Sequence, residues 1–230
     1  MKELAFVTVF FDYPQDAQPI ASKNLAKYGR MEDLFVARFS GLPQGTSYYE
    51  KLTTYKVDYL LPYIQENILG KYEYTLFFDA TDVNLFKDPS GIIKDFKTFD
   101  ADIVFNGERE LWPATSKTHL YSEKQILGPA RYLNSGLYIG TTEKIVEHLD
   151  NLIKGNDLER ITDQAIWANY YLEHPEIKLD QKYKLFFSTH KAKEYVDIEE
   201  GPVCLRGISP YLIHDNGPYS DETIKITHLI

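Results

Sequence analysis

The sequence contains a single cysteine, no glycine-rich phosphate loop and no long hydrophobic run. Because Cys204 stands alone, an intrachain disulfide and a zinc site built on cysteines are both excluded. Neither G-x-x-x-x-G-K-S/T nor G-x-G-x-x-G occurs, so a P-loop and a dinucleotide fingerprint are excluded as well. No segment approaches the roughly 20 apolar residues that a membrane-spanning helix needs. Any nucleotide bound by this chain therefore has to be held by other means than a glycine-rich cradle.

Basic residues are in the minority. Lysine and arginine number 25 against 34 aspartate and glutamate residues, which gives a net charge of -9. Because phosphate neutralisation needs a basic face, this balance argues against a nucleic-acid partner. With 43% hydrophobic residues, the 230-residue chain can bury a substantial core, and we expect one domain over residues 1–230. The oligomeric state stays open.

The first residues carry no targeting pattern. Met1, Lys2 and Glu3 lead directly into a strand-like run, without the charged and apolar regions of a signal peptide. A single cysteine fits a reducing compartment. We therefore expect a cytoplasmic protein.

Strand-like and helix-like segments alternate along the chain. Runs rich in β-branched and aromatic residues predict strands at Leu4–Phe11, Asp33–Phe39, Tyr74–Phe78, Ala101–Phe105 and Ser135–Gly140. Helical spacing predicts helices at about Ile20–Tyr28, within 48–68, and at about Thr142–Ile153 and Thr162–Glu173. The remainder of the chain looks irregular and partly β. Strands joined by helical crossovers imply a mainly parallel sheet in an α/β fold.

Two aspartates follow the third predicted strand, in the segment FFDATDVNLF at residues 77–86. Ligands of open α/β sheets sit beyond the carboxyl ends of the strands, and Asp79 and Asp82 occupy such a place. Buried carboxylates cost free energy unless a positive partner meets them. We therefore predict that both chelate a divalent cation whose remaining positions take phosphate oxygens. The alternative is structural, with Asp79 capping a turn and Asp82 facing solvent.

His214, in YLIHDNGPYS at residues 211–220, is a third candidate ligand. A strand-like approach delivers the imidazole, and Asn216-Gly217-Pro218 then forces a turn that fixes it near the sheet edge. A nitrogen ligand favours manganese over magnesium. A lone histidine is more often a hydrogen-bonded structural residue. Its pairing with the two aspartates is what makes it a candidate ligand.

Two further segments place polar residues where a ligand would explain them. In RYLNSGLYIG at residues 131–140, Asn134, Ser135 and Gly136 interrupt an apolar strand. This interruption is costly unless these residues meet a ligand or cap a neighbouring element. In ITDQAIWANYYL at residues 161–172, Thr162 is expected to cap a helix that has Asp163 in its first turn. That structural role is sufficient to explain Asp163 without a substrate.

These segments, together with ELWPA at residues 110–114, resemble the glycosyltransferase domain at the N-terminus of the procollagen lysyl hydroxylases and related collagen glycosyltransferases. The similarity extends from about residue 4 to residue 220. It implies a GT-A-type glycosyltransferase fold, that is a Rossmann-like, mainly parallel sheet flanked by helices. It further implies a UDP-sugar donor and a Mn²⁺ ion, with Asp79, Asp82 and His214 as the metal ligands.

The resemblance also implies roles for other residues. Lys56 matches a lysine that contacts the nucleotide, Thr8 and Val9 match the uridine edge, and Asn216 matches an asparagine near the diphosphate. Trp112 matches a tryptophan over the sugar site, and Asp163 with Gln164 faces the transferred sugar. The expected nucleotide-binding residues are Thr8, Val9, Lys56, Asp79, Thr81, Asp82, Asn216 and Gly217, and the expected catalytic residues are Asp163, Gln164, Trp112 and Asn134.

Three positions depart from the family pattern. Thr81 stands where the family has an aromatic residue near the uracil, so either Phe10 or Phe11 supplies the stacking or the donor preference is altered. Thr162 replaces an acid, which removes one carboxylate near the donor sugar. Asp215 replaces a glycine and is expected to add a negative charge beside the metal.

The function expected from the resemblance is transfer of glucose or galactose from UDP-glucose or UDP-galactose to a hydroxyl of an acceptor protein or glycan. Collagen-like hydroxylysine, its galactosyl derivative, another glycan or a small polyol all stay open as acceptors, as do retention and inversion. The sequence lacks the hydroxylase domain of the animal enzymes, so we expect no lysine hydroxylation. The alternatives are a metal-dependent nucleotidyltransferase, which also uses strand-end acids, and a nucleotide-sugar binding module without catalysis.

Overall fold

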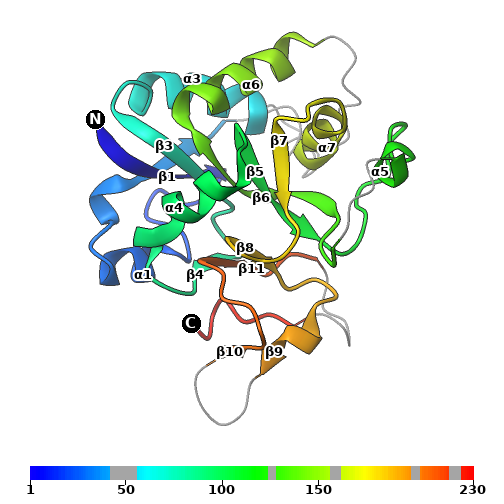
Figure 1. Ribbon diagram of the computed structural model, residues 1–230. Coiled ribbons are helices and arrows are strands. Elements are labelled where there is room, and N and C mark those ends of the chain that lie inside the picture. The colour runs from blue at the N-terminus through cyan, green and yellow to red at the C-terminus, as the bar shows by residue number, and fades with distance from the viewer. Residues whose placement is uncertain (42–55, 124–127, 156–161, 198–202, 218–223) are drawn as a thin grey trace.

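The computed structural model describes residues 1–41, 56–123, 128–155, 162–197, 203–217 and 224–230 (Figure 1). The strands are β1 (Lys2–Phe11), β2 (Leu34–Phe39), β3 (Tyr72–Phe78), β4 (Val83–Leu85), β5 (Ile103–Glu108), β6 (Tyr132–Thr141), β7 (Ile177–Asp180), β8 (Phe186–Ser188), β9 (Val196–Asp197), β10 (Cys204–Leu205) and β11 (Leu212–His214). The α-helices are α1 (Ser22–Lys27), α3 (Lys56–Asn67), α4 (Ile92–Phe96), α5 (Leu120–Glu123), α6 (Thr142–Lys154) and α7 (Asp163–Glu173).

A six-stranded mixed sheet forms the centre of the molecule, in the order β2-β1-β3-β6-β5-β7. Strand β1 pairs in parallel with β2 and β3, and β5 pairs in parallel with β7. Only β6 among these six strands runs the other way, antiparallel to β3 and β5. The prediction of a mainly parallel α/β sheet is confirmed. The reversed strand brings its first residues to the edge where β3 and β5 end.

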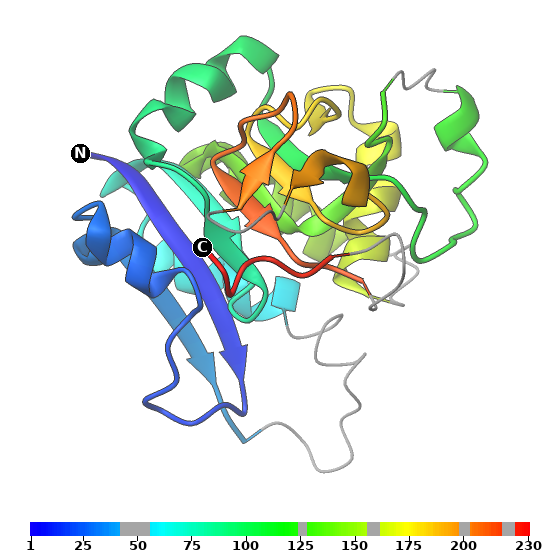
Figure 2. The same ribbon diagram turned by 90° about the horizontal axis from the view of Figure 1, so that it is seen from below.

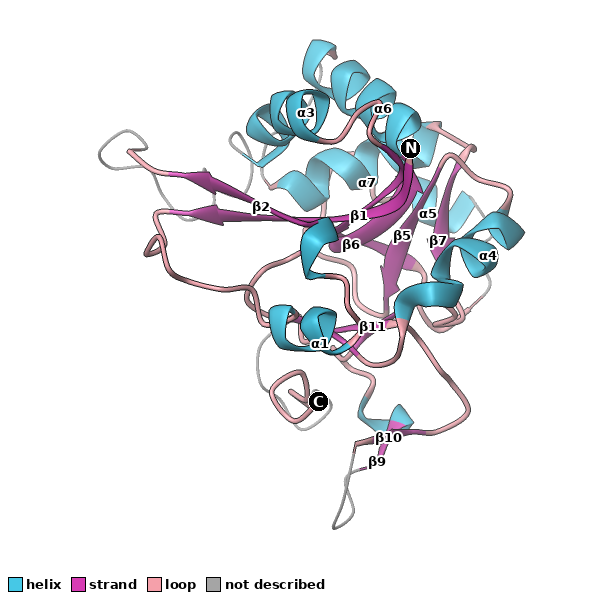
Figure 3. Cartoon of the chain, turned by 90° about the vertical axis from the view of Figure 1, so that its left-hand side faces the viewer, coloured by secondary structure: helices cyan, strands magenta, loops and turns pink. Residues whose placement is uncertain are grey.

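Helices and a second sheet cover the two faces of the central sheet. Helices α3, α6 and α7 pack on one face, around a cluster that includes Phe77, Phe105 and Trp167. On the other face, α1, α4 and a three-stranded sheet, β4-β11-β8, enclose a second cluster that includes Phe6 and Phe78. Figure 3 shows this layering, with α3 and α6 above the strands, α1 below them and α4 beside β7.

The five predicted strands and four predicted helices are present with shifted ends, as far as the described residues reach. Within 48–68, α3 begins at Lys56, and residues 48–55 lie outside the described part of the chain. Thr162 caps α7 as expected, because its hydroxyl oxygen accepts a hydrogen bond from the Ala165 N–H at 3.1 Å. In the described part of the chain, no helix is long and apolar enough to cross a membrane.

The three-stranded sheet brings distant parts of the sequence together. Strand β11 pairs with β4 and β8, so His214 lies opposite Val83 and Ser188. The final segment, 224–230, runs back past β4 towards α1, and the Asn84 side chain donates a hydrogen bond to the Thr227 carbonyl at 2.8 Å (Figure 2). This arrangement delivers His214 to the carboxyl end of β3, where Asp79 lies.

Candidate functional site

A cavity of about 710 Å³ opens at the carboxyl ends of β3 and β5. Its volume is within the range of roughly 300–1,000 Å³ that is usual for small-molecule sites. Among the described residues, five acidic side chains line it, those of Asp79, Asp82, Glu108, Glu110 and Asp163, and Lys56 is the only lysine. Because the lining is so acidic, an anionic ligand is repelled unless a cation accompanies it.

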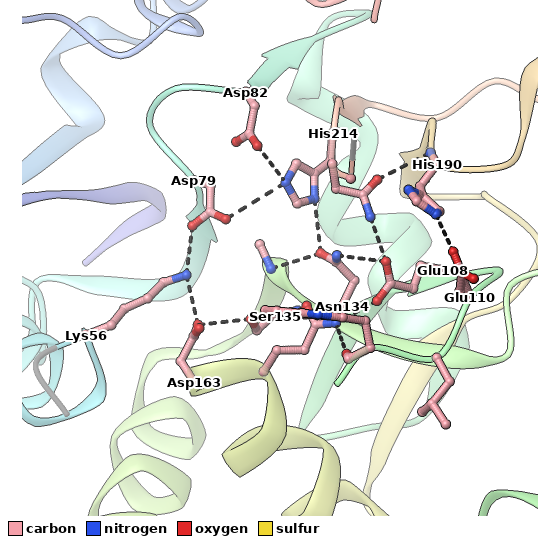
Figure 4. A pocket seen from close by; sticks show the side chains of 16 residues that line it. Lys56, Asp79, Asp82, Glu108, Glu110, Asn134, Ser135, Asp163, His190 and His214 are labelled. Atoms are coloured by element: carbon pink, nitrogen blue, oxygen red, sulfur yellow. Dashed lines mark hydrogen bonds and ion pairs between the residues drawn. The ribbon is translucent and has the colours of Figure 1, made fainter. Parts of the chain in front are cut away.

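Asp79, Asp82 and His214 converge on one point of the cavity (Figure 4). Their ligand atoms all lie within 4.8 Å of one another. The Nε2 atom of His214 is 3.4 Å from the Asp82 carboxylate and 3.8 Å from the Asp79 carboxylate. One cation bridges such a span, because opposite ligands of a hard ion are about 4–5 Å apart at bond lengths of roughly 2.0–2.6 Å. The sequence prediction that these three residues lie together is confirmed.

Asp79, Asp82 and His214, called the triad below, carry charges that stabilise one another. Burial disfavours the charged imidazole, but the Asp82 carboxylate outweighs this effect, so the pKa of His214 is raised above its ordinary value. Burial likewise opposes the ionised Asp82, yet its pKa is lowered because His214 lies beside it. A cation at this point competes with the proton on Nε2, so metal binding at the triad releases protons.

Asn134 orients the imidazole of His214. Its Oδ1 accepts a hydrogen bond from the Gly136 N–H at 2.9 Å and faces His214 Nδ1 at 3.0 Å, while its Nδ2 donates to Glu108 at 3.3 Å. A flipped amide would point its NH₂ group at the Gly136 N–H, so the orientation is determined. Nδ1 of His214 therefore carries a proton, and Nε2 is left to bind a cation.

An unpaired carboxylate oxygen is a second reason why the residues of the triad fit a divalent cation. Oδ1 of Asp82 is buried and has no hydrogen-bond partner among the described residues. An unpaired buried carboxylate oxygen costs free energy, and a cation would remove that cost. Two carboxylates and one imidazole form a donor set that suits Mn²⁺.

Asn134→Ala tests the orienting contact. The substitution leaves His214 Nδ1, the Gly136 N–H and the Glu108 carboxylate each without one partner, so the imidazole loses its fixed direction. We expect Mn²⁺ affinity to fall about 10- to 100-fold, the usual cost of removing an outer partner of a metal ligand. Calorimetric titration with Mn²⁺ measures this. Asn67→Ala is the control, because the Asn67 side chain donates a hydrogen bond to the Tyr63 carbonyl at 2.9 Å, within α3.

Gly136 allows the backbone of β6 to pass close to the triad. A Cβ atom at this position would lie 2.2 Å from His214 Cε1 and 2.8 Å from Asp79 Oδ2. The Gly136 carbonyl also accepts a hydrogen bond from the Asp79 N–H at 2.9 Å, which continues the pairing of β3 with β6. The sequence flagged this glycine as an interruption of a strand, and its close approach to the metal ligands explains it.

Gly136→Ala is expected to weaken Mn²⁺ binding by about tenfold or more, because the methyl group displaces both His214 and Asp79 from the common point. Gly155→Ala is the matched control, since the closest atom to a Cβ there, the Asn151 carbonyl oxygen, is 3.4 Å away. Electron paramagnetic resonance of free Mn²⁺ reports the affinity of each variant. Equal affinity in Gly136→Ala and the wild type would contradict the placement of the metal.

Lys56 connects Asp79 to the start of α7. Its Nζ lies 2.8 Å from Asp79 Oδ1 and 2.8 Å from Asp163 Oδ2, and its side chain is only 5% exposed. Burial disfavours the ammonium ion, but Asp163 and Asp79 outweigh this, so the pKa of Lys56 is raised and the side chain stays charged. Asp163 Oδ2 also accepts a hydrogen bond from the Ser135 hydroxyl at 2.9 Å.

Glu108 joins three of the predicted site residues. Its carboxylate accepts hydrogen bonds from the side-chain amides of Asn134 at 3.3 Å, Gln164 at 2.6 Å and Asn216 at 2.6 Å. Burial raises the pKa of Glu108 to about 8, although the three amides and His214 favour the carboxylate. This buried acid holds β6, α7 and the segment after β11 in fixed relation to one another.

Sequence reasoning missed Glu108, Glu110 and His190, all of which line the cavity. His190 Nε2 lies 2.6 Å from a Glu110 carboxylate oxygen, and the other oxygen of Glu110 is 2.7 Å from Lys191 Nζ. The signal for Glu108 was present, because it is an acid at the end of a buried strand, as Asp79 is. The predicted strand, however, ended at Phe105. No local pattern marked His190.

Of the remaining predicted site residues, some line the cavity and others do not. Trp112, Asp163, Gln164, Asn216 and Gly217 line the cavity, and Trp112 is 47% exposed there. Thr8 and Val9 are buried within β1, and neither they nor the exposed Thr81 belong to the lining. Their expected contact with uridine stays a prediction.

The Asp215 side chain contacts the final segment of the chain, and the expected negative charge beside the metal stays a prediction. One oxygen of this carboxylate accepts hydrogen bonds from the backbone N–H and the hydroxyl of Thr227, both at 2.7 Å. Asp215 thus fastens the final segment to the strand that carries His214, and the charge serves a structural contact.

Comparison with known proteins identifies the family. The model of the family described as the PLOD GT domain matches residues 44–226, which is most of the chain. The chain belongs to the PLOD glycosyltransferase domain family. The chain is also similar to a procollagen-lysine,2-oxoglutarate 5-dioxygenase of Drosophila melanogaster, with 31% identity over 156 residues. It is 27% identical over 145 residues to the uncharacterized protein R699 of Acanthamoeba polyphaga mimivirus.

The alignments cover only part of these relatives. They include 62% and 61% of this chain, but 21% of the Drosophila protein and 30% of the mimivirus protein. Among solved structures, the fold of this PLOD glycosyltransferase domain is similar to that of a glycosyltransferase involved in the glycosylation of the major capsid of PBCV-1. That match has a TM-score of 0.52, 11% sequence identity and 94% coverage of both chains. At this identity the likeness shows the fold alone, and it agrees with a GT-A-like architecture.

Proposed function

We propose that this glycosyltransferase domain transfers glucose or galactose from a UDP-sugar to an acceptor hydroxyl, with a divalent cation, Mn²⁺, at the triad. The observation that carries the proposal is the convergence of Asp79, Asp82 and His214 inside a cavity whose described lining holds five acidic residues and one lysine. A nucleoside diphosphate is repelled by such a cavity until a cation is bound. When bound, the ion would neutralise the charge that develops on the departing diphosphate.

Lys56 is the residue of this chain that we assign to the leaving nucleotide. Its ammonium group is buried, is permanently charged and lies between Asp79 on the metal side and Asp163 on the other. A fixed positive charge in a buried site stabilises developing negative charge strongly, because no solvent has to reorganise. Asn216, which is held by Glu108, also lines the cavity.

Trp112, Gln164 and Asp163, which also line the cavity, are assigned to the sugar. Trp112 offers an exposed aromatic face there, and its carbonyl oxygen accepts a hydrogen bond from Gln164. Asp163, fixed by Lys56 and Ser135, would stabilise positive charge on the sugar ring or orient the acceptor hydroxyl. Thr162 carries no charge, so Asp163 supplies the only carboxylate among the first residues of α7. The acceptor we propose is a hydroxyl of a protein or glycan, collagen-like hydroxylysine or its galactosyl derivative being the first to test.

The test is a donor and acceptor screen on the full chain. We expect Mn²⁺-dependent release of UDP from UDP-glucose or UDP-galactose, increased by a peptide that contains hydroxylysine or galactosyl-hydroxylysine. Release of pyrophosphate from a nucleoside triphosphate and a sugar phosphate would instead identify a nucleotidyltransferase. Mn²⁺-dependent UDP binding without turnover on any acceptor would identify a binding module.

A further inference from the structure

A second group of metal-ligating side chains lies outside the cavity. A nitrogen of His148, a nitrogen of His174 and a carboxylate oxygen of Glu176 lie within 4.8 Å of one another. His148 belongs to α6, whereas His174 and Glu176 belong to the connection between α7 and β7. Figure 1 shows α7 beside β7, with α6 on the same side of the sheet. Two separate segments of the chain therefore meet at this cluster.

The cluster is at the far end of α7 from the cavity. Asp163 begins this helix at the cavity, and His174 follows its last residue. At about 1.5 Å per residue, the 11 residues of α7 separate the two places by roughly 16 Å. A cation at the cluster is thus a different ion from the one proposed at Asp79, Asp82 and His214.

The side chains of the cluster are held in place by neighbouring groups. His174 Nδ1 is 2.7 Å from Glu176 Oε1, and the His174 ring stacks on the Tyr170 ring with centroids 3.7 Å apart. The side chain of His148 is 4% exposed and lies with Nε2 3.2 Å from Asp102 Oδ2 and Nδ1 3.1 Å from the Tyr170 hydroxyl. These contacts fix both imidazoles before any ion binds.

The backbone beneath the cluster is fixed as well. The Asp102 N–H donates to the Glu176 carbonyl at 2.9 Å, and the Ile177 N–H donates to the His174 carbonyl at 3.2 Å. Pro175, between the two ligands, has a restricted φ angle. The spacing of His174 and Glu176 is therefore set by the fold, and binding an ion costs little ordering of the chain.

We propose that His148, His174 and Glu176 form a Zn²⁺ site that clamps the carboxyl end of α7 to α6 and to the start of β7. Two imidazoles and one carboxylate are a usual set of three protein ligands for zinc, with a water molecule in the fourth position. Neighbouring ligands of tetrahedral zinc are about 3.3 Å apart at bond lengths of roughly 2.0–2.1 Å. The three ligand atoms lie within 4.8 Å of one another, so we expect side-chain movement to bring them to that spacing.

The same residues can also be explained without a metal ion, as two separate hydrogen-bonded histidine–carboxylate pairs. That reading explains the pair of His148 with Asp102 and the pair of His174 with Glu176. It gives no reason why both pairs meet at one point from different elements. The site and the simple pairs differ in one measurable respect, which is binding of a single zinc ion.

The experiment uses the full chain after chelator treatment, with Asp82→Asn as background so that the cavity triad is disabled. Zn²⁺ alone is titrated by calorimetry and by thermal unfolding. We expect one tight equivalent of Zn²⁺ and a concentration-dependent rise in Tm, because the ion binds only the folded state. In the same background, His174→Gln is expected to weaken zinc binding about tenfold or more and to remove the rise in Tm.

His119→Gln is the matched control, since it removes an exposed histidine outside the cluster. Glu176→Gln serves as a second variant in case His174→Gln fails to fold. Co²⁺ adds a spectroscopic readout, because tetrahedral and octahedral sites differ in their visible absorption. Zinc binding that persists at full affinity in both cluster variants, or no zinc binding in the Asp82→Asn background, would overturn the proposal.

Discussion

Asp82→Asn is expected to lower Mn²⁺-dependent UDP-sugar turnover by about 100- to 1,000-fold, the cost usual for losing one stabilising group of a buried catalytic site. Asparagine keeps the shape of the side chain but removes its charge and one oxygen. In the wild type, one oxygen faces His214 at 3.4 Å and the other is buried without a hydrogen-bond partner among the described residues. Both oxygens are therefore available to a cation, and the variant offers one neutral oxygen instead.

The fold of this variant is expected to persist, because His214 can release its proton once the neighbouring carboxylate is gone. Turnover is measured as UDP release against Mn²⁺ concentration, so that weaker metal binding is separated from slower chemistry. The control is Asp88→Asn, which neutralises an exposed aspartate that caps the turn at Ser90. Wild-type turnover at low Mn²⁺ in Asp82→Asn would remove this residue from the metal site.

Lys56→Met is expected to destabilise the protein by about 3 kcal/mol, the lower part of the range for breaking a buried ion pair from one side. We expect the lower end of this free-energy range because only one of the two carboxylates is buried. The Asp163 side chain is 6% exposed, whereas the Asp79 side chain is 31% exposed and water screens its charge. Without the ammonium group, the two carboxylates face each other across the space it filled. For a protein of this size, we expect Tm to fall by about 6–12 °C.

A double variant separates the charge effect from a packing effect. Lys56→Met combined with Asp163→Asn removes the unpaired buried carboxylate, so part of the lost stability should return. Urea unfolding of the single and double variants gives the coupling free energy directly. Lys94→Met, on the exposed side of α4, is the control for loss of a lysine. The free energy of unfolding lost through Asp163→Asn is measured in the wild type and in the Lys56→Met background. Equal losses in the two backgrounds would show that the two residues do not interact.

UDP affinity in the presence of Mn²⁺ gives a second readout for Lys56. Because we assign its charge to the nucleotide, Lys56→Met should weaken UDP binding and slow turnover together, while Lys94→Met changes neither. Binding is measured below the melting temperature of each variant, so that unfolded protein does not lower the apparent affinity.

Several parts of the site follow from local sequence. Asp79 comes directly after the buried strand β3, and His214 ends β11 just before the Asn216-Gly217 turn, as predicted. Thr162 was recognised as a helix cap because a hydroxyl before an apolar helix has a defined partner three residues on. In each case the physical cause lies within a few residues of the feature, which is why the pattern is readable.

The end of β5 shows where local reading fails. The strand was predicted to stop at Phe105, but it continues to Glu108 after an irregularity between Phe105 and Asn106. A bulge breaks the alternation that signals a strand. Glu108 consequently looked like a loop residue, although it lies at the strand end as the centre of three amide contacts.

Sequence alone determined five strands and four helices of the α/β pattern, the acids at the end of β3 and the family to which the chain is similar. The tertiary structure decided that the Asn134 amide orients His214, that Glu108 binds Asn216, and that Gly136 makes room for the metal ligands. These partners are separated by up to 108 residues along the chain. Local patterns reflect forces between near neighbours, whereas these contacts exist only after β6, β5 and β11 have met at one edge of the sheet.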